Sequence, residues 1–137
     1  MKGGEGMREI KYRAWDIQTE SMRDVLVIDW VNELIDLSGG IIERRPHEVV
    51  LMQFTGLEDK KGMAVCECDV VIIENHPFEK KDDSDVGIKI EGMYAIHWNE
   101  EDLTWCAGNW LLSKVKSYVR VIGNIYENPE LLATKKD

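Results

Sequence analysis

Three cysteines and three histidines are the residues of this chain that would bind a transition metal. Cys66 and Cys68 are two positions apart, and side chains at that spacing on a strand point the same way, so both thiolates would reach one zinc ion. Zinc sites built on turns use a C-x-x-C spacing instead, and Cys106 has no neighbouring cysteine. We therefore interpret the cysteines as small, reduced core residues and expect no metal.

Two sets of residues have types that suit catalysis, and a structural role is the alternative for each. A cysteine nucleophile would need one of the histidines, His47, His76 or His97, as a base, and no local spacing supports that pairing. Glu67 and Asp69 would be about 6–7 Å apart on one strand face, a separation that suits two-carboxylate chemistry. A solvent-facing strand edge explains them better. With no glycine-rich phosphate loop and no GxSxG motif, we expect a non-enzymatic protein without a cofactor.

Tryptophan is the remaining unusual residue, with five in the chain. Aromatic rings close together in sequence would form a surface for a base, a proline-rich peptide or another subunit. Packing in the core of a small β-domain is the alternative, and we favour it. The candidate binding face consists of Tyr94, Trp98, Trp105 and Trp110. For nucleic acid, the cations needed beside these rings would be Lys11, Lys114, Lys116 and Arg120.

Strands must position these residues, because the apolar runs are short and rich in β-branched side chains. We predict strands over residues 10–17, 22–30, 87–98, 103–106 and 118–126, with residues 25–28 as the core of the second. Residues 49–73 are predicted to form a hairpin. Its turn is marked by Asp59, whose side chain can accept backbone hydrogen bonds, and Gly62, which can take a positive φ. Asn128 and Pro129 predict a helix start.

Some segments are less regular in pattern. Residues 31–46 fit either a short helix or strands, and residues 74–85 indicate a polar loop. The fold class we expect is all-β, with a small SH3-like barrel over residues 62–126, extra N-terminal strands and little helix. Residues 1–6 fit a leader or expression remnant, residues 7–132 a single domain, and residues 133–137 a frayed tail.

Composition and charge limit the function further. The chain has 137 residues, 44% of them hydrophobic, so its body should fold around a core. It has 17 Lys and Arg residues and 26 Asp and Glu residues, which gives a net charge of -9. That charge argues against nucleic-acid binding driven by a basic field. No membrane span or signal peptide is evident, so we expect a cytoplasmic protein.

One stretch also resembles a known family. QFTGLEDKKG followed by ECDVV is similar to the YopX-like proteins of phages and prophages, where we expect Q-(Y/F)-T-G-L-x-D-x-x-G and then E-G-D-(I/V)-V. RAWD (residues 13–16) and VIGNIYENPELL (residues 121–132) resemble the family's opening and closing motifs. Cys68 stands where the family usually has glycine, which implies a relaxed geometry there if that glycine serves a turn. The motif residues are Gln53, Phe54, Thr55, Gly56, Leu57, Asp59, Gly62, Glu67, Asp69, Val71, Gly123, Asn124, Asn128 and Pro129.

The resemblance implies an all-β accessory protein of a phage or prophage, in the cytoplasm of the bacterial host, and no assigned activity. We therefore expect a self-associating interaction module that forms a homo-oligomer through edge strands and apolar aromatic residues. A phage or host protein is a further candidate partner. The alternative is a protein that binds nucleic acid or a host factor through the aromatic face.

Overall fold

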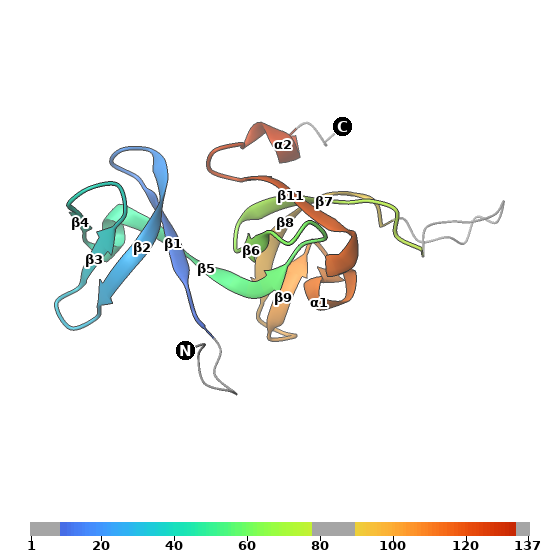
Figure 1. Ribbon diagram of the computed structural model, residues 1–137, viewed down its shortest axis with the longest axis horizontal. Helices are drawn as coiled ribbons and strands as arrows, with labels where there is room; N and C mark the ends of the chain where they lie inside the picture. The colour runs from blue at the N-terminus through green and yellow to red at the C-terminus, as the bar shows by residue number, and fades with distance from the viewer. Residues whose placement is uncertain (1–8, 78–89, 134–137) are drawn as a thin grey trace. The chain divides into compact units, whose positions relative to one another are not determined.

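The computed structural model describes residues 9–77 and 90–133, which divide into two compact units, Met1–Gly56 (unit 1) and Leu57–Asp137 (unit 2). The all-β prediction is confirmed, because the strands form two antiparallel sheets and helix is confined to short segments (Figure 1). Within the described ranges, no helix has both the length and the apolar character needed to cross a bilayer.

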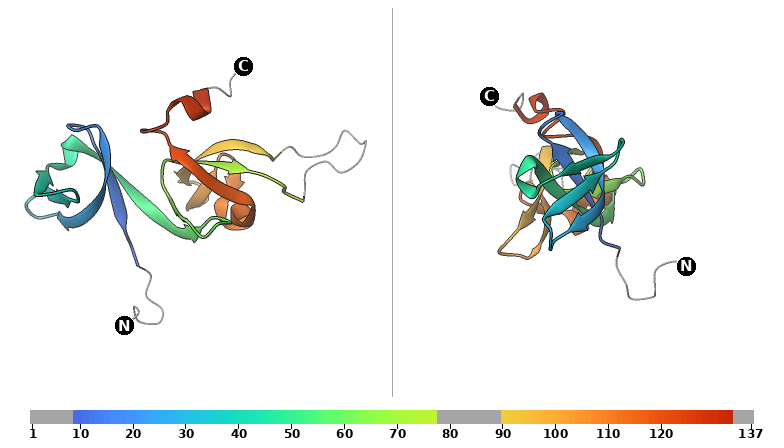
Figure 2. Two further views of the ribbon diagram at one scale, coloured as in Figure 1. Left: turned by 45° about the horizontal axis from the view of Figure 1, so that its top comes forward. Right: turned by 90° about the vertical axis from the view of Figure 1, so that its left-hand side faces the viewer.

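The first sheet has the order β4-β3-β2-β1-β5-β6, and unit 1 supplies most of it. Residues 31–46, for which the sequence left helix and strand open, form strands joined by short turns (Figures 1 and 2). A 3₁₀ turn, Pro46–Glu48, then leads into β5. The strands are β1 (Tyr12–Asp16), β2 (Ser21–Asp29), β3 (Leu34–Leu37), β4 (Ile42–Arg44), β5 (Val49–Glu58) and β6 (Ala64–Cys66).

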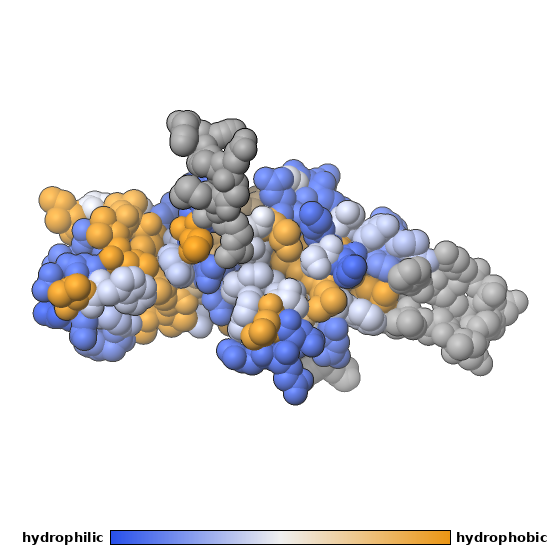
Figure 3. Space-filling view, turned by 90° about the horizontal axis from the view of Figure 1, so that it is seen from below, coloured by the Kyte–Doolittle hydropathy of each residue, from blue (hydrophilic) through white to orange (hydrophobic). Residues whose placement is uncertain are grey.

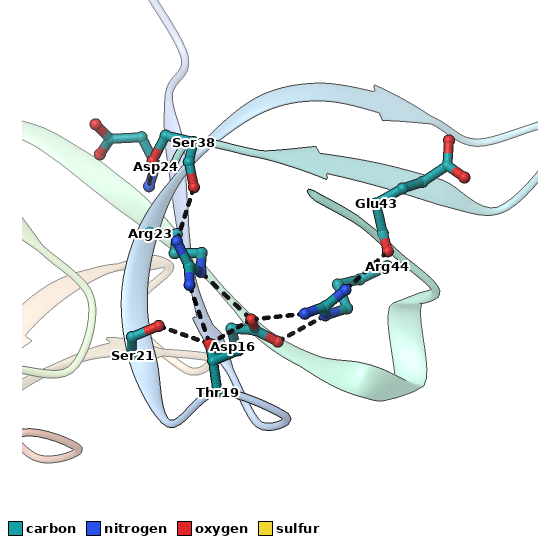
Figure 4. A network of polar contacts seen from close by, with 8 residues as sticks. All are labelled: Asp16, Thr19, Ser21, Arg23, Asp24, Ser38, Glu43 and Arg44. Atoms are coloured by element: carbon teal, nitrogen blue, oxygen red, sulfur yellow. Dashed lines mark hydrogen bonds and ion pairs between the residues drawn. The ribbon is translucent and has the colours of Figure 1, made fainter. Parts of the chain in front are cut away.

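A buried carboxylate holds three strands of unit 1 together (Figure 4). Asp16, at the end of β1, is 0% exposed and accepts hydrogen bonds from Arg44 on β4 at 2.8 and 3.1 Å. Arg23 on β2 donates to the same carboxylate at 3.3 Å, and Thr19 donates at 2.6 Å. This network supplements a small apolar core made of Ala14, Ile35, Leu37 and Val49.

Unit 2 contains the larger core and the second sheet, in the order β10-β9-β8-β7-β11. Its strands are β7 (Asp69–Ile73), β8 (Gly92–Asn99), β9 (Thr104–Ala107), β10 (Trp110–Leu111) and β11 (Val119–Asn124). The helical segments α1 (Leu112–Val115), a 3₁₀ turn (Lys116–Tyr118) and α2 (Glu130–Ala133) follow β10 and β11. The buried core residues are Val65, Val71, Ile73, Ile90, Ile96, Ala107, Leu112, Val115 and Val119.

The described strands form two sheets and no closed barrel, and the SH3-like detail stays a prediction. The single-domain boundaries at residues 7 and 132 also stay a prediction. The expected leader at residues 1–6 lies outside the described residues, as do most of the expected loop at residues 74–85 and all of the expected tail at residues 133–137 except Ala133, which ends α2.

The second arm of the central hairpin is not continuous, contrary to the prediction for residues 63–73. β6 lies beside β5, whereas β7 pairs with β8 and β11 in the other sheet, so the chain turns a corner at Glu67 and Cys68. Cys66 and Cys68 therefore do not share a strand face. Glu67 and Asp69 do not share one either, because Glu67 lies in the turn and Asp69 begins β7.

Cys68 has φ +72°, so the relaxed geometry expected at this position is also wrong. The cysteine takes the left-handed conformation that a glycine adopts at little cost. Its N–H donates to the Ile96 carbonyl at 2.9 Å, and its own carbonyl accepts from the Ile125 N–H at 3.0 Å. These two backbone bonds tie the corner to neighbouring segments of unit 2 and hold the strained conformation in place.

Candidate functional site

Asp59, the centre of the first sequence motif, is a backbone acceptor rather than a reactive group. Its Oδ1 accepts the N–H groups of Lys61 and Met63 at 2.8 Å each, and its Oδ2 accepts the Val121 N–H at 2.9 Å. Gly62 has φ +86°, so the predicted turn is confirmed. Burial raises the pKa of Asp59, but the backbone hydrogen bonds outweigh it and the net pKa is lowered.

The closing motif is likewise a set of turn-forming residues. Asn124 accepts the N–H groups of Tyr126 and Glu127 on its side-chain oxygen, at 3.0 and 2.8 Å. Asn128 returns a hydrogen bond by accepting the Asn124 N–H at 3.2 Å. A side chain at Gly123 would place its Cβ 2.4 Å from the Asn128 oxygen, so this close approach requires glycine. The predicted helix start is confirmed, since α2 begins at Glu130.

The other motif residues also serve the fold. Thr55 and Asp69 are buried, and the Asp69 carboxylate accepts the Cys66 N–H at 2.7 Å across the corner. Gly56 has φ +86° within β5, a conformation that disfavours other residues. Gln53, Leu57 and Glu67 are half-buried, and Pro129 is exposed ahead of α2. The motifs that carry the family resemblance thus shape turns and strand corners.

The residues considered for metal or nucleophilic chemistry do not converge. Within the described residues, no three His, Cys, Asp or Glu side chains are placed to hold a metal ion. Cys106 is buried, and burial raises the pKa of its thiol, as does the charge of Asp102, which disfavours a thiolate nucleophile. His76 is buried with its ring 4.6 Å from that of Tyr118, whereas His47 is exposed. The His97 Nε2 lies 2.8 Å from the Gly108 carbonyl oxygen.

The aromatic set from β8 to β10 is divided between core and surface. Tyr94, Trp105 and Trp110 are partly buried against the core of unit 2, and the Tyr94 hydroxyl donates to the Ile90 carbonyl at 2.6 Å. Trp98 is 39% exposed and makes an edge-to-face contact with Trp105, with ring centroids 5.1 Å apart. Of the four residues of the proposed face, Trp98 is therefore the one that is exposed to a ligand, with the edge of the half-buried Trp105 beside it.

The cations expected beside these rings are dispersed. Arg120 donates to Glu74 at 3.0 Å, and Glu74 also pairs with Lys60 at 3.2 Å. Lys114 and Lys116 are exposed on the short helical segments after β10, and Lys11 belongs to unit 1. No basic cluster at the aromatic pair is evident among the described residues.

An apolar surface on unit 1, which the sequence did not reveal, is the strongest binding feature. In the described part of the chain, seven of the large apolar side chains that remain exposed belong to unit 1, against four in unit 2. Figure 3 shows apolar residues gathered on the surface of unit 1. The seven are Ile10, Ile17, Leu26, Val27, Trp30, Val31 and Ile41.

Part of this surface is a groove of about 430 Å³ lined by residues 10–12, residues 24–28 and Phe54. β2 pairs with β1 as far as Asp24 and with β3 from Val25 onward, so its edge on the β1 side is open beyond Asp24 within the described residues. A bulge between Val25 and Val27 interrupts the register. Leu26 and Val27 are 62% and 52% exposed, so the prediction that residues 25–28 form a strand core is wrong for these two.

Two cations flank the apolar groove. The Lys11 ammonium and the Arg13 guanidinium each lie 6.0 Å from the centre of the Phe54 ring, the distance of a weak cation–π contact. Asp24 adds one negative charge to the lining. The groove lining therefore combines apolar walls, an open strand edge and one charge of each sign, Lys11 and Asp24.

Fold and surface together define a two-unit, all-β protein whose motif residues shape the backbone and whose main described surface feature is an apolar groove. The chain belongs to the YopX family, because the family model described as YopX protein matches residues 11–133. A crystal structure of protein EF1440 from Enterococcus faecalis is similar, at 25% identity over 92% of this chain and 99% of that chain, with a TM-score of 0.60. No curated protein matches significantly.

Proposed function

We propose that this protein is a non-enzymatic accessory protein of a phage or prophage, and that it works by associating with itself through the apolar groove of unit 1. The observation that carries the proposal is the open edge of β2 next to the exposed side chains of Leu26 and Val27. Contiguous apolar surface and open strand edges are features that proteins usually cover in an assembly.

Energetics support a covered groove. Fully burying a leucine or valine side chain contributes about 1.5–3 kcal/mol, and Leu26 and Val27 are 62% and 52% exposed, so covering them recovers about half of that free energy for each. Among the described residues, the core cluster of unit 1 has four buried apolar members, which makes the exposure of Leu26 and Val27 more costly than it would be in a large domain. Contact with a second protein surface recovers that free energy and also gives the β2 backbone groups a partner.

The test is solution mass by light scattering over a range of protein and salt concentrations. The wild-type chain, 15.8 kDa as a monomer, should give a single salt-insensitive oligomer. Leu26→Ser with Val27→Ser should reduce the mass to that of the monomer. Leu103→Ser is the matched control, because Leu103 is 68% exposed in unit 2 and lies outside the groove. A wild-type monomer at every concentration contradicts the proposal.

A second candidate function, binding of nucleic acid or a host factor, would use the exposed Trp98 ring, which makes an edge-to-face contact with the half-buried Trp105. Stacking of a base on such a ring contributes about 1–3 kcal/mol. Titrating single-stranded DNA while following tryptophan fluorescence tests it, with Trp98→Ala as the variant. The net charge of -9 opposes this function, so we rank it below self-association.

A further inference from the structure

The turn between β2 and β3 displays two apolar side chains on a well-ordered backbone. Trp30 is 70% exposed and Val31 is 89% exposed, directly after β2 ends. The Asp29 carboxylate accepts the N–H groups of Val31 and Asn32 at 3.1 and 3.0 Å and the Asn32 side-chain amide at 2.8 Å. Arg45 donates to the Asn32 carbonyl at 3.3 Å. These bonds hold the turn without using either apolar side chain.

Tryptophan on a preorganised turn is a typical anchor of protein interfaces, because its large ring is ordered at low entropic cost and gains much from burial. We refer to Trp30 and Val31 with their flanking acids, Asp29 and Glu33, as the tip. The hydrogen bonds to Asp29 lower the pKa of its carboxyl, with the Asn32 backbone bond as the largest cause. The tip is thus an apolar pair between two negative charges.

The tip and the groove are complementary in character. The groove has apolar walls from Ile10, Leu26 and Val27, and its lining includes Lys11, whose ammonium lies 6.0 Å from the centre of the Phe54 ring. A tryptophan entering it would meet apolar walls, while an acid beside the tip would meet the Lys11 ammonium. The pairing of opposite charges around an apolar anchor is the pattern that sets orientation in protein complexes.

The tip cannot fill the groove of its own chain. Leu26 is three residues before the end of β2 at Asp29, so roughly 10 Å of extended strand separates it from the turn that carries Trp30. The hairpin is held by the β2–β3 pairing from Val25 to Asp29, so it does not fold back. The complementary surface has to come from another molecule.

We propose that the tip of one copy binds in the groove of a second copy of this chain. This inference rests on the proposed function and specifies the contact by which self-association occurs. Each copy then inserts its tip into a neighbouring groove and receives a tip in its own groove. Every groove in the assembly is therefore covered by a tip.

Complementation between two variants tests this contact. Trp30→Ser with Val31→Ser removes the tip but leaves the groove, whereas Leu26→Ser with Val27→Ser removes the groove but leaves the tip. Each variant alone should bind itself at least about thirty-fold more weakly than the wild type, the loss typical of an anchor residue. An equimolar mixture should form a complex of one copy of each, measured by light scattering and by sedimentation. Circular dichroism and a thermal melt confirm that both variants are folded.

The outcomes separate this inference from the proposed function. If the groove variant loses association but the tip variant keeps it, the groove is an interface whose occupant is another surface, and the inference is overturned. If both variants lose association and the mixture does not restore it, the inference also fails. If the wild type itself is monomeric, the proposed function fails.

A charge reversal gives an independent check. Lys11→Glu and Glu33→Lys, each alone, should weaken association about five-fold or more by placing like charges together. The double variant should recover most of that loss, because opposite charges again meet across the contact. A double variant as weak as the sum of the single ones would show that these residues do not face each other.

Discussion

Replacing the buried carboxylate of unit 1 tests how far a single ionic network stabilises this small core. We consider Asp16→Asn, which keeps the size of the side chain but removes its charge. Arg44, whose side chain is only 14% exposed, loses the carboxylate that accepts two of its hydrogen bonds. Arg23, whose side chain is 20% exposed, loses its ion pair with the same carboxylate. Both guanidinium groups then remain largely out of water without a carboxylate.

The magnitude follows from the pKa of Asp16, which is lowered from 3.8 to about 2. The Arg44 hydrogen bond is the largest cause; burial opposes it, and Thr19 and Arg23 add to the lowering. A shift of this size corresponds to about 2 kcal/mol of stability near neutral pH. The pKa of Asp16 is lower in the folded protein than in the unfolded chain, so its contribution to the free energy of unfolding decreases as the pH falls. The contribution is nearly complete above about pH 4, falls to about half at pH 3 and is nearly lost at about pH 2. We expect Asp16→Asn to destabilise the protein by about 2–3 kcal/mol at pH 7.

The assay is urea denaturation of the wild type and the variant at pH 7 and pH 3. The stability gap between them should shrink by about 1 kcal/mol at pH 3, since the wild-type carboxylate is then partly protonated in the unfolded chain. Asp36→Asn is the matched control, because Asp36 is half-buried on β3 and its side chain makes no hydrogen bond or ion pair within the described residues. A gap that is the same at both pH values would refute the reasoning.

Further variants test the turns at Cys68, Asp59 and Gly123, each by urea denaturation against the wild type. Cys68→Gly should stabilise by about 1 kcal/mol, because φ +72° strains cysteine but not glycine; unchanged or lower stability would contradict that account. Asp59→Ala should destabilise by about 3 kcal/mol, because three part-buried hydrogen bonds, from the N–H groups of Lys61, Met63 and Val121, are lost at about 1 kcal/mol each. Asp59→Asn should cost less. Gly123→Ala should destabilise by about 1–3 kcal/mol through the clash of its Cβ with the Asn128 side chain. In an Asn128→Ala background the cost of Gly123→Ala should be smaller, with the 3.0 Å contact to Leu131 remaining.

The turns were the part of the fold that the sequence predicted well, because their causes are local. Asp59 and Gly62 lie three residues apart, and a side-chain acceptor with a positive φ glycine is sufficient to define that turn. The same holds for the helix start after Asn128 and Pro129. The all-β class followed from short β-branched runs, which need no knowledge of partners.

The corner at Cys68 was missed because its usual local signal is absent. A glycine there would have marked a break in the run from residue 63 to residue 73. With cysteine in its place, the run looks continuous, and only the pairing of β6 with one sheet and β7 with the other separates them. The candidate carboxylate and thiol pairs were lost for the same reason, since strand periodicity does not continue through a turn.

The sequence by itself determined the all-β class, the turns and the family, because each depends on residues close together or on motifs read in order. Only the tertiary structure decided which apolar residues are covered. Residues 25–28 are four apolar residues in a row, and nothing local distinguishes Val25, which packs in the core, from Leu26, which faces water. Whether each of these side chains is buried depends on the residue at which β1 stops pairing with β2 and on the position of the β2 bulge. Both features depend on pairing with other strands, which the local sequence of residues 25–28 does not specify.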